Sequence, residues 1–95
     1  MDKKDKALLM DKILRELEDL KNSQASLVKK IGQIEADNIN LGDQQLEKSL
    51  SAIYDSIASG TDQVTSLVTD YQQKRDKFVL DNNLQEALSV SGNAG

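Results

Sequence analysis

The chain has 95 residues, of which 38% are hydrophobic and 29% are charged, and its net charge is −4. It contains no Cys, His, Trp or Pro, which excludes disulfides, thiolate metal sites and imidazole general bases. An acidic chain gains nothing from counterion release at a phosphate backbone, so we expect no nucleic-acid partner.

The N-terminus does not have the pattern of a secretory leader. Residues 1–6 carry charges of both signs, and the apolar cluster from Ala7 to Met10 is far shorter than a leader core. We therefore expect no cleavable signal peptide and no membrane span. The protein is expected to stay in the cytoplasm, or to be secreted by a route that reads a folded helical signal.

Apolar residues recur every three or four positions in the first part of the chain. The run is Met10, Ile13, Leu17, Leu20, Gln24, Leu27, Ile31, Ile34, Asn38 and Leu41. This spacing predicts a helix over about 7–38 with this face packed against another helix. Of the two polar interruptions, we assign Asn38 to a turn. Gln24 stays open, because a buried polar side chain at such a position can also fix the register of a helix pair.

Turn-forming residues are densest at about 38–44. Gly42 is suited to end a helix, and Asp43 is suited to cap the next one. The phase of the apolar positions also slips between residues 41 and 46. We therefore predict that the chain reverses here, with Leu41 and Gly42 in the turn.

A second run predicts a helix over about 44–88. It consists of Leu46, Leu50, Ile53, Ile57, Gly60, Val64, Leu67, Tyr71, Lys74 and Phe78. Gly60 could separate two helices, but the apolar phase is kept from Ile57 to Val64, which favours one continuous helix, bent or straight. Lys74 is interpreted as a side chain that extends its charge to solvent. Residues 89–95 are mostly small and lack the apolar content to pack, so they are predicted to form a flexible tail.

These elements predict an all-α fold, a single domain formed by a long antiparallel helical hairpin. Further apolar residues flank the two runs, and a hairpin by itself would leave them exposed. They are Leu9, Leu14, Val28, Tyr54, Val68, Leu80, Leu84 and Leu88. Scattered surface residues are one interpretation. The other is a partner interface, in which a second hairpin completes a four-helix bundle. The partner would be a second copy or a different helical protein.

No residue pattern indicates catalysis. The carboxylates Glu16, Glu18 and Asp19, and later Asp70 and Asp76, stand beside Lys or Arg at helical spacing, which is typical of a solvated face. The sequence has no Gly-rich phosphate loop, nucleophile elbow or metal-spaced cluster. We expect no enzyme activity, no cofactor, no metal and no small-molecule substrate.

The outline of the chain resembles the WXG-type small proteins of the bacterial type VII secretion system and the helical relatives that accompany LXG toxins. The resemblance is carried by the length, the two arms and the central Gly42. The WxG position reads Asn40, Leu41 and Gly42, so the Trp is missing. A YxxxD/E motif would begin at Tyr71 but meets Arg75, and an FxxxD motif would begin at Phe78 but meets Asn82, with Asp81 one residue earlier.

This resemblance implies a hairpin that pairs into a four-helix bundle and is exported, or that escorts a toxin or effector as a targeting factor. It makes Tyr71, Phe78, Asp81 and Asn82 candidate recognition residues for export. The alternative is a cytosolic coiled-coil subunit or chaperone in a larger helical assembly. A membrane-surface helix is disfavoured, because it needs a basic polar face and the second arm is acidic.

Overall fold

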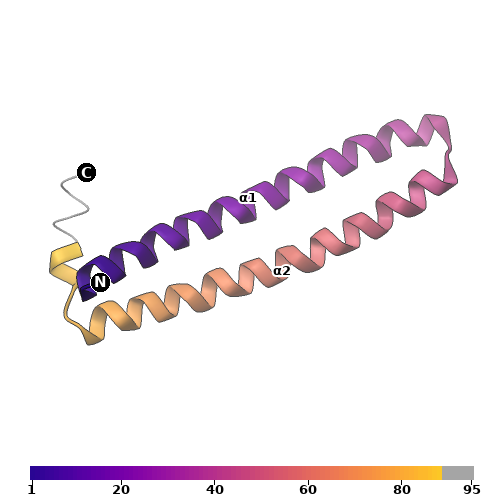
Figure 1. The fold of residues 1–95 in the computed structure, drawn as a ribbon. Helices are drawn as coiled ribbons and strands as arrows, with labels where there is room; N and C mark the ends of the chain where they lie inside the picture. Colours follow the sequence, from indigo (N-terminus) through magenta and orange to yellow (C-terminus); the bar gives the residue numbers. More distant parts are fainter. Residues whose placement is uncertain (89–95) are drawn as a thin grey trace. The chain divides into compact units, whose positions relative to one another are not determined.

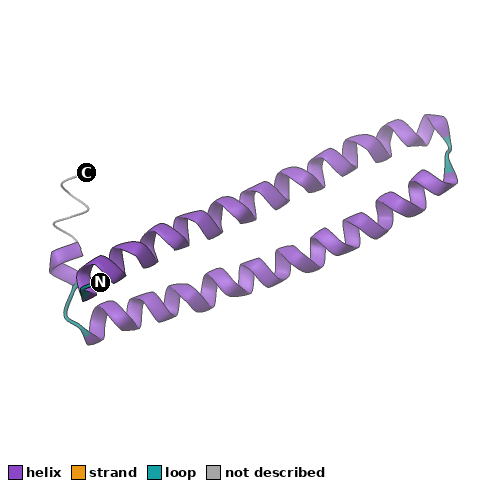
Figure 2. Ribbon diagram, viewed as in Figure 1, coloured by secondary structure: helices purple, strands orange, loops and turns teal. Residues whose placement is uncertain are grey.

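The computed structural model describes residues 1–88 and contains two long α-helices (Figure 1). Helix α1 spans Lys3–Leu41 and α2 spans Gln44–Asp81. No strand occurs in the described part of the chain (Figure 2). The all-α helical hairpin predicted from the sequence is therefore confirmed. The predicted tail, 89–95, lies outside the described residues.

Helix α1 begins four residues before the predicted start because Asp2 caps it. The Asp2 carboxylate accepts a hydrogen bond from the Asp5 amide at 2.7 Å, and the Asp2 carbonyl accepts one from Lys6 at 3.0 Å. This is the standard N-cap geometry of a short acidic side chain. The periodicity could not locate it, because the first turn precedes the first apolar residue.

The predicted turn is confirmed, and a side chain fastens it. Gly42 has a φ of 73°, which favours glycine, and its amide donates to the Asn38 carbonyl at 2.7 Å. The buried Asn38 amide donates to the Asp43 carbonyl at 3.0 Å and accepts from the Asp43 amide at 3.1 Å. The Asp43 carboxylate then caps α2 through the Leu46 amide. Asn38 and Leu41 are themselves helical, because α1 continues to Leu41 and does not end at about 38 as predicted. Only Gly42 and Asp43 lie between the helices, and Asn38 contributes to the turn through its side chain.

Helix α2 runs through Gly60 without a break, as the preserved apolar phase predicted. Thr61, the next residue, donates its hydroxyl to the Ile57 carbonyl at 2.8 Å, so its polar atom is satisfied within the helix.

The predicted end of the second helix at residue 88 is wrong, because α2 stops at Asp81. Asn83 takes the left-handed conformation with a φ of 53°, and the Leu84 amide donates to the Val79 carbonyl at 3.0 Å. This pattern is that of a helix-ending Schellman turn, with Asn in the place usually taken by Gly. A short helical turn over 85–88 follows, and it turns away from the direction of α2 (Figure 1).

The described residues form two compact units. Within residues 1–88, unit 1 comprises residues 1–18 with residues 67–88, and unit 2 comprises Asp19–Ser66. In unit 1 a small core forms where the turn after α2 folds back: Phe78 and Leu84 pack against the buried Ala7, Val79 and Leu88. In unit 2 the two helices are joined by the turn, and Ile31, Asn38 and Leu50 are buried.

The inner face of α1 differs in one row from the predicted run. Met10, Leu17, Gln24, Ile31 and Asn38 are buried or half-buried, as predicted. The second row of covered residues on α1, however, lies four residues after members of the first row, whereas the sequence predicted a spacing of three. Leu14 and Val28 therefore face the core of their units, and the row that begins Leu20, Leu27 does not. Both rows are apolar, and a pair of helices covers only one of the two rows.

Candidate interaction surfaces

Unit 2 exposes a row of large aliphatic side chains along α1. The row, which we call the aliphatic row, consists of Leu20, Leu27, Ile34 and Leu41, with exposed fractions of 46%, 46%, 45% and 72%. Its members are seven residues apart, so they lie along one side of the helix. Single exposed leucines are common, but a regular row of this length is typical of a helix-packing surface.

The corresponding row of α2 is uncharged, and most of the exposed residues beside it are small. Leu46, Ile53 and Gly60 occupy it, and Ile53 is 49% exposed. The exposed residues that flank it are Ser49, Ala52, Ser56, Ser59 and Gln63. The two charged residues of α2 between positions 49 and 66, Asp55 and Asp62, fall elsewhere on the helical wheel. The exposed residues Ser49, Ala52, Ser56 and Ser59 form a strip, which we call the small strip. Their short side chains allow close approach of another helix.

The aliphatic row and the small strip lie on the same side of unit 2. An open groove is lined by Glu35 and Ile39 of α1 together with Glu47 and Ser51 of α2, so these positions of the two helices face the same way. On each helical wheel, the inner face separates the groove residues from the exposed row: the aliphatic row on α1 and the small strip on α2. They therefore form one continuous surface, which we call the outer face.

Gln24 is a half-buried polar side chain between the helices of unit 2. A Cβ built on Gly60 would lie 3.3 Å from the Gln24 Nε2, so the absence of a side chain at residue 60 makes room for the amide. The Gln24 Oε1 is buried and accepts no hydrogen bond from the described residues. A buried acceptor without a partner reduces stability. The sequence did not decide the role of Gln24; in the structure its side chain lies at the level of Gly60 on the other helix.

Replacing Gln24 by Leu should raise the free energy of unfolding by about 1 kcal/mol, because it removes the unpaired buried oxygen at similar volume. Urea unfolding followed by circular dichroism measures the change. Gln45→Leu, at an exposed position of α2, serves as the control and should change little. A Gln24→Leu protein that is less stable than the parent would show that the amide is satisfied by water or by a partner chain.

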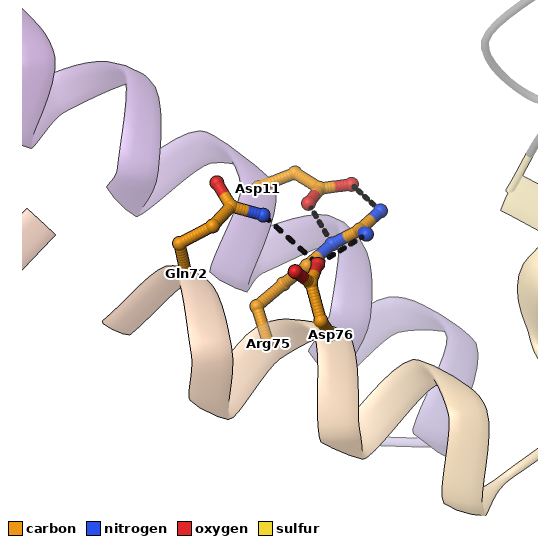
Figure 3. Close-up of polar contacts among 4 residues, drawn as sticks. All are labelled: Asp11, Gln72, Arg75 and Asp76. Carbon is orange, nitrogen blue, oxygen red and sulfur yellow. Dashed lines mark hydrogen bonds and ion pairs between the residues drawn. The ribbon is translucent and has the colours of Figure 1, made fainter. Parts of the chain in front are cut away.

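Unit 1 carries a cluster of polar contacts between its helices (Figure 3). The Arg75 guanidinium donates from Nε to Asp11 Oδ1 at 2.6 Å and from Nη2 to Asp11 Oδ2 at 3.3 Å. It also contacts Asp76 at 3.2 Å, and Gln72 donates to the same Asp76 carboxylate at 2.9 Å. The two-point pairing with Asp11 joins residues 64 positions apart in sequence, so it fixes the register of unit 1.

The Asp11 carboxylate raises the pKa of Arg75 above its ordinary value, chiefly through the hydrogen bond, against a smaller opposing effect of burial. A raised pKa of a base contributes stability below its ordinary pKa, and this is lost only as the pH rises through the higher value. For Arg that range is strongly alkaline, so this contribution is constant near neutral pH. The cluster has the features of a structural ion pair, not of a catalytic group.

Replacing Asp11 by Asn should lower the free energy of unfolding by about 1 kcal/mol, because the charge-assisted pair is only a quarter exposed. Asp76→Asn is the matched control, since Asp76 is more exposed and adjacent to Arg75 in sequence; it should cost about 0.3 kcal/mol. Urea unfolding at low and high salt measures both changes. Equal losses for the two variants would contradict the special role of Asp11.

The residues predicted to contact a partner have different surroundings. Leu9, Tyr54 and Leu80 are exposed, whereas Val28, Val68 and Leu84 are half-buried and Leu14 and Leu88 are buried within the chain. Five of these eight side chains are therefore covered at least in part within the chain itself, and three are open to a partner. The aliphatic row was instead assigned to the inner seam, because its spacing fits either role.

The candidate export residues gather at the end of α2 in unit 1. Tyr71 is half-buried, and Phe78 packs in the small core with the Lys6 ammonium 5.4 Å from its ring centre. The Asn82 side chain donates to the Phe78 carbonyl at 2.8 Å and so closes the helix. Asp81 is exposed. Of the four, Asp81 is therefore the side chain most accessible to another protein.

Within residues 1–88, no helix is long and apolar enough to cross a membrane, and no group of three or more acidic residues has an arrangement that could hold a metal ion. Comparison with protein-family models, curated proteins and solved structures finds no match to this chain.

Proposed function

We propose that the protein is a helical interaction module whose outer face packs against a second copy of the same chain to complete a four-helix arrangement. The observation that carries this proposal is the aliphatic row, which stays about half exposed while a different row forms the inner seam. Exposed aliphatic side chains in a regular row gain free energy when another helix covers them.

The outer face is large enough for a specific complex. In unit 2 each helix contributes about 23 residues, which at 1.5 Å per residue is about 35 Å of length. Two adjacent helices about 20 Å wide together offer about 700 Å² per copy, or about 1,400 Å² in total. Specific protein interfaces bury roughly 1,200–2,000 Å².

The outer face is also complementary to itself. The large side chains of the aliphatic row lie beside the small strip. A two-fold axis parallel to the helices would place the aliphatic row of each copy against the small strip of the other copy. Such an axis allows no sliding along the helices, so it sets the register. Gln24 lies beside Gly60, so Leu27 is level with Ile57. Ser56, the next residue and a member of the exposed small strip, would face Leu27 from the other copy.

Cysteine cross-linking tests this arrangement, because the natural chain contains no Cys. A mixture of two single variants, Leu27→Cys and Ser56→Cys, should give a mixed disulfide dimer on mild oxidation. Lys29→Cys, on another side of α1, is the control and should not cross-link to Ser56→Cys. A Leu27→Cys protein that cross-links efficiently to itself would contradict this arrangement, and absence of all cross-links would contradict the pairing.

In the cell, we propose that this module serves type VII secretion, either as an exported protein or as the escort of a larger toxin or effector. The outline of the hairpin and the position of Asp81 at the end of α2 support this role. Asp81→Ala should abolish export in a host with that machinery without changing thermal stability, since Asp81 is exposed. Glu86→Ala is the exposed control. Unchanged export would contradict this role but not the pairing.

A further inference from the structure

The groove of unit 2 lies on the side away from the outer face and close to the turn. It has a volume of about 550 Å³ and is open to solvent. Small residues form much of it: Gly32 and Ala36 of α1, Gly42 of the turn, and Ser51 of α2. Ile39 also lines the groove and is 82% exposed, so a large apolar side chain at the edge is accessible to a ligand.

Gly32 lines the groove, and neither its backbone conformation nor a close contact requires a glycine there. Gly42 is required by its positive φ, and Gly60 makes room for Gln24. A Cβ on Gly32 would meet no atom within 4 Å, and its φ lies outside the left-handed region. Because a mid-helix Gly costs about 1 kcal/mol relative to Ala, Gly32 sacrifices helix stability and leaves open space.

Two acidic side chains flank this space without a basic partner. Glu35 and Glu47 line the groove from α1 and α2. Neither forms an ion pair among the described residues. No Lys or Arg occupies the positions three or four residues away from either of them. The groove therefore combines an apolar floor with uncompensated negative charge.

We propose that this groove binds a short basic helix of a partner protein, which places an aliphatic side chain over Gly32 and Ala36 and an Arg or Lys between Glu35 and Glu47. An aliphatic group gains from the apolar floor and from Ile39. A cation would find two carboxylates that lack a basic partner, and charge complementarity selects such a helix over an acidic one. This site is separate from the outer face, so its failure and that of the pairing can be told apart.

The test titrates two synthetic peptides into the full chain labelled with ¹⁵N. Both are alanine-based helices with Leu and Arg spaced four residues apart, but in the second peptide Glu replaces each Arg. The Arg peptide should shift the amide signals of Gly32, Ile39 and Ser51, and the Glu peptide should not. Equal shifts with both peptides, shifts confined to Leu27 and Ile34, or no shifts at all would overturn the proposal.

Variants distinguish filling of the groove from loss of the fold. Gly32→Leu should weaken binding of the Arg peptide about tenfold or more, because the new side chain occupies the groove. Its thermal midpoint should be equal or higher, because Leu is the better helix former and its Cβ has open space. Gln33→Leu, one residue further round the helix, should bind normally. Glu35→Gln and Glu47→Gln should each weaken binding about fivefold. Full binding by Gly32→Leu would overturn the proposal.

Discussion

Replacing Leu27 by Glu is expected to dissociate the paired form while the hairpin stays folded. Leu27 is near the middle of the aliphatic row and is about half exposed in the single chain, so a charge there remains hydrated. In the pair, the same carboxylate would be buried against the small strip of the other copy. The lost apolar contact and the desolvated charge together should weaken pairing more than about a hundredfold. Sedimentation velocity over a concentration series measures it.

Lys29→Asp is the matched control for this experiment. It makes the net charge more negative by two units, whereas Leu27→Glu changes it by one, and it does so two residues away, at an exposed position on another side of the helix. It should leave the dissociation constant within about threefold, which corresponds to a surface-charge effect of about half a kcal/mol. If Leu27→Glu and Lys29→Asp were to weaken pairing equally, net charge would be responsible, and the outer face would not be the contact surface.

Ile31→Ala is expected to destabilise the single chain by about 2–4 kcal/mol, more than the loss of the Asp11–Arg75 ion pair. Ile31 is 6% exposed, so truncation removes buried methylene groups and leaves space that the two helices fill only in part. A small hairpin has little stability in reserve, so the unfolding midpoint in urea should fall steeply. Circular dichroism at a concentration too low for pairing measures the single chain.

Ile34→Ala provides the comparison, because it makes the same chemical change three residues later. Ile34 belongs to the aliphatic row, so in the single chain its loss should cost less than about 1 kcal/mol. In the pair it should weaken association about tenfold. Equal losses of single-chain stability for Ile31→Ala and Ile34→Ala would contradict the assignment of inner and outer rows.

The elements of the fold were predictable because each depends on local signals. Periodicity located both helices, Gly42 and Asp43 marked the turn, and the unbroken phase around Gly60 predicted a continuous α2. The end of α2 was missed because Asn83 takes the left-handed conformation. Asn does so only sometimes, and the apolar residues that follow look like a continued helix.

The interaction surfaces were less predictable because three apolar rows compete for the seam. Leu17 is inner in either arrangement, but the choice between Leu14 and Ile13 as its neighbour depends on how α2 packs, which no local signal decides. The groove was missed for a similar reason. Gly32 is an isolated glycine within an otherwise helical pattern, and only the placement of Glu47 and Ser51 across from it reveals the open space.

We propose that a second copy of the chain covers the outer face. Light scattering after size-exclusion chromatography, over a range of concentrations, tests it most directly. We predict a mass that rises from that of one chain, 10.5 kDa, to twice that value as concentration increases. A folded chain that keeps the mass of one copy at every concentration would contradict self-pairing, and would leave the outer face to a different helical protein.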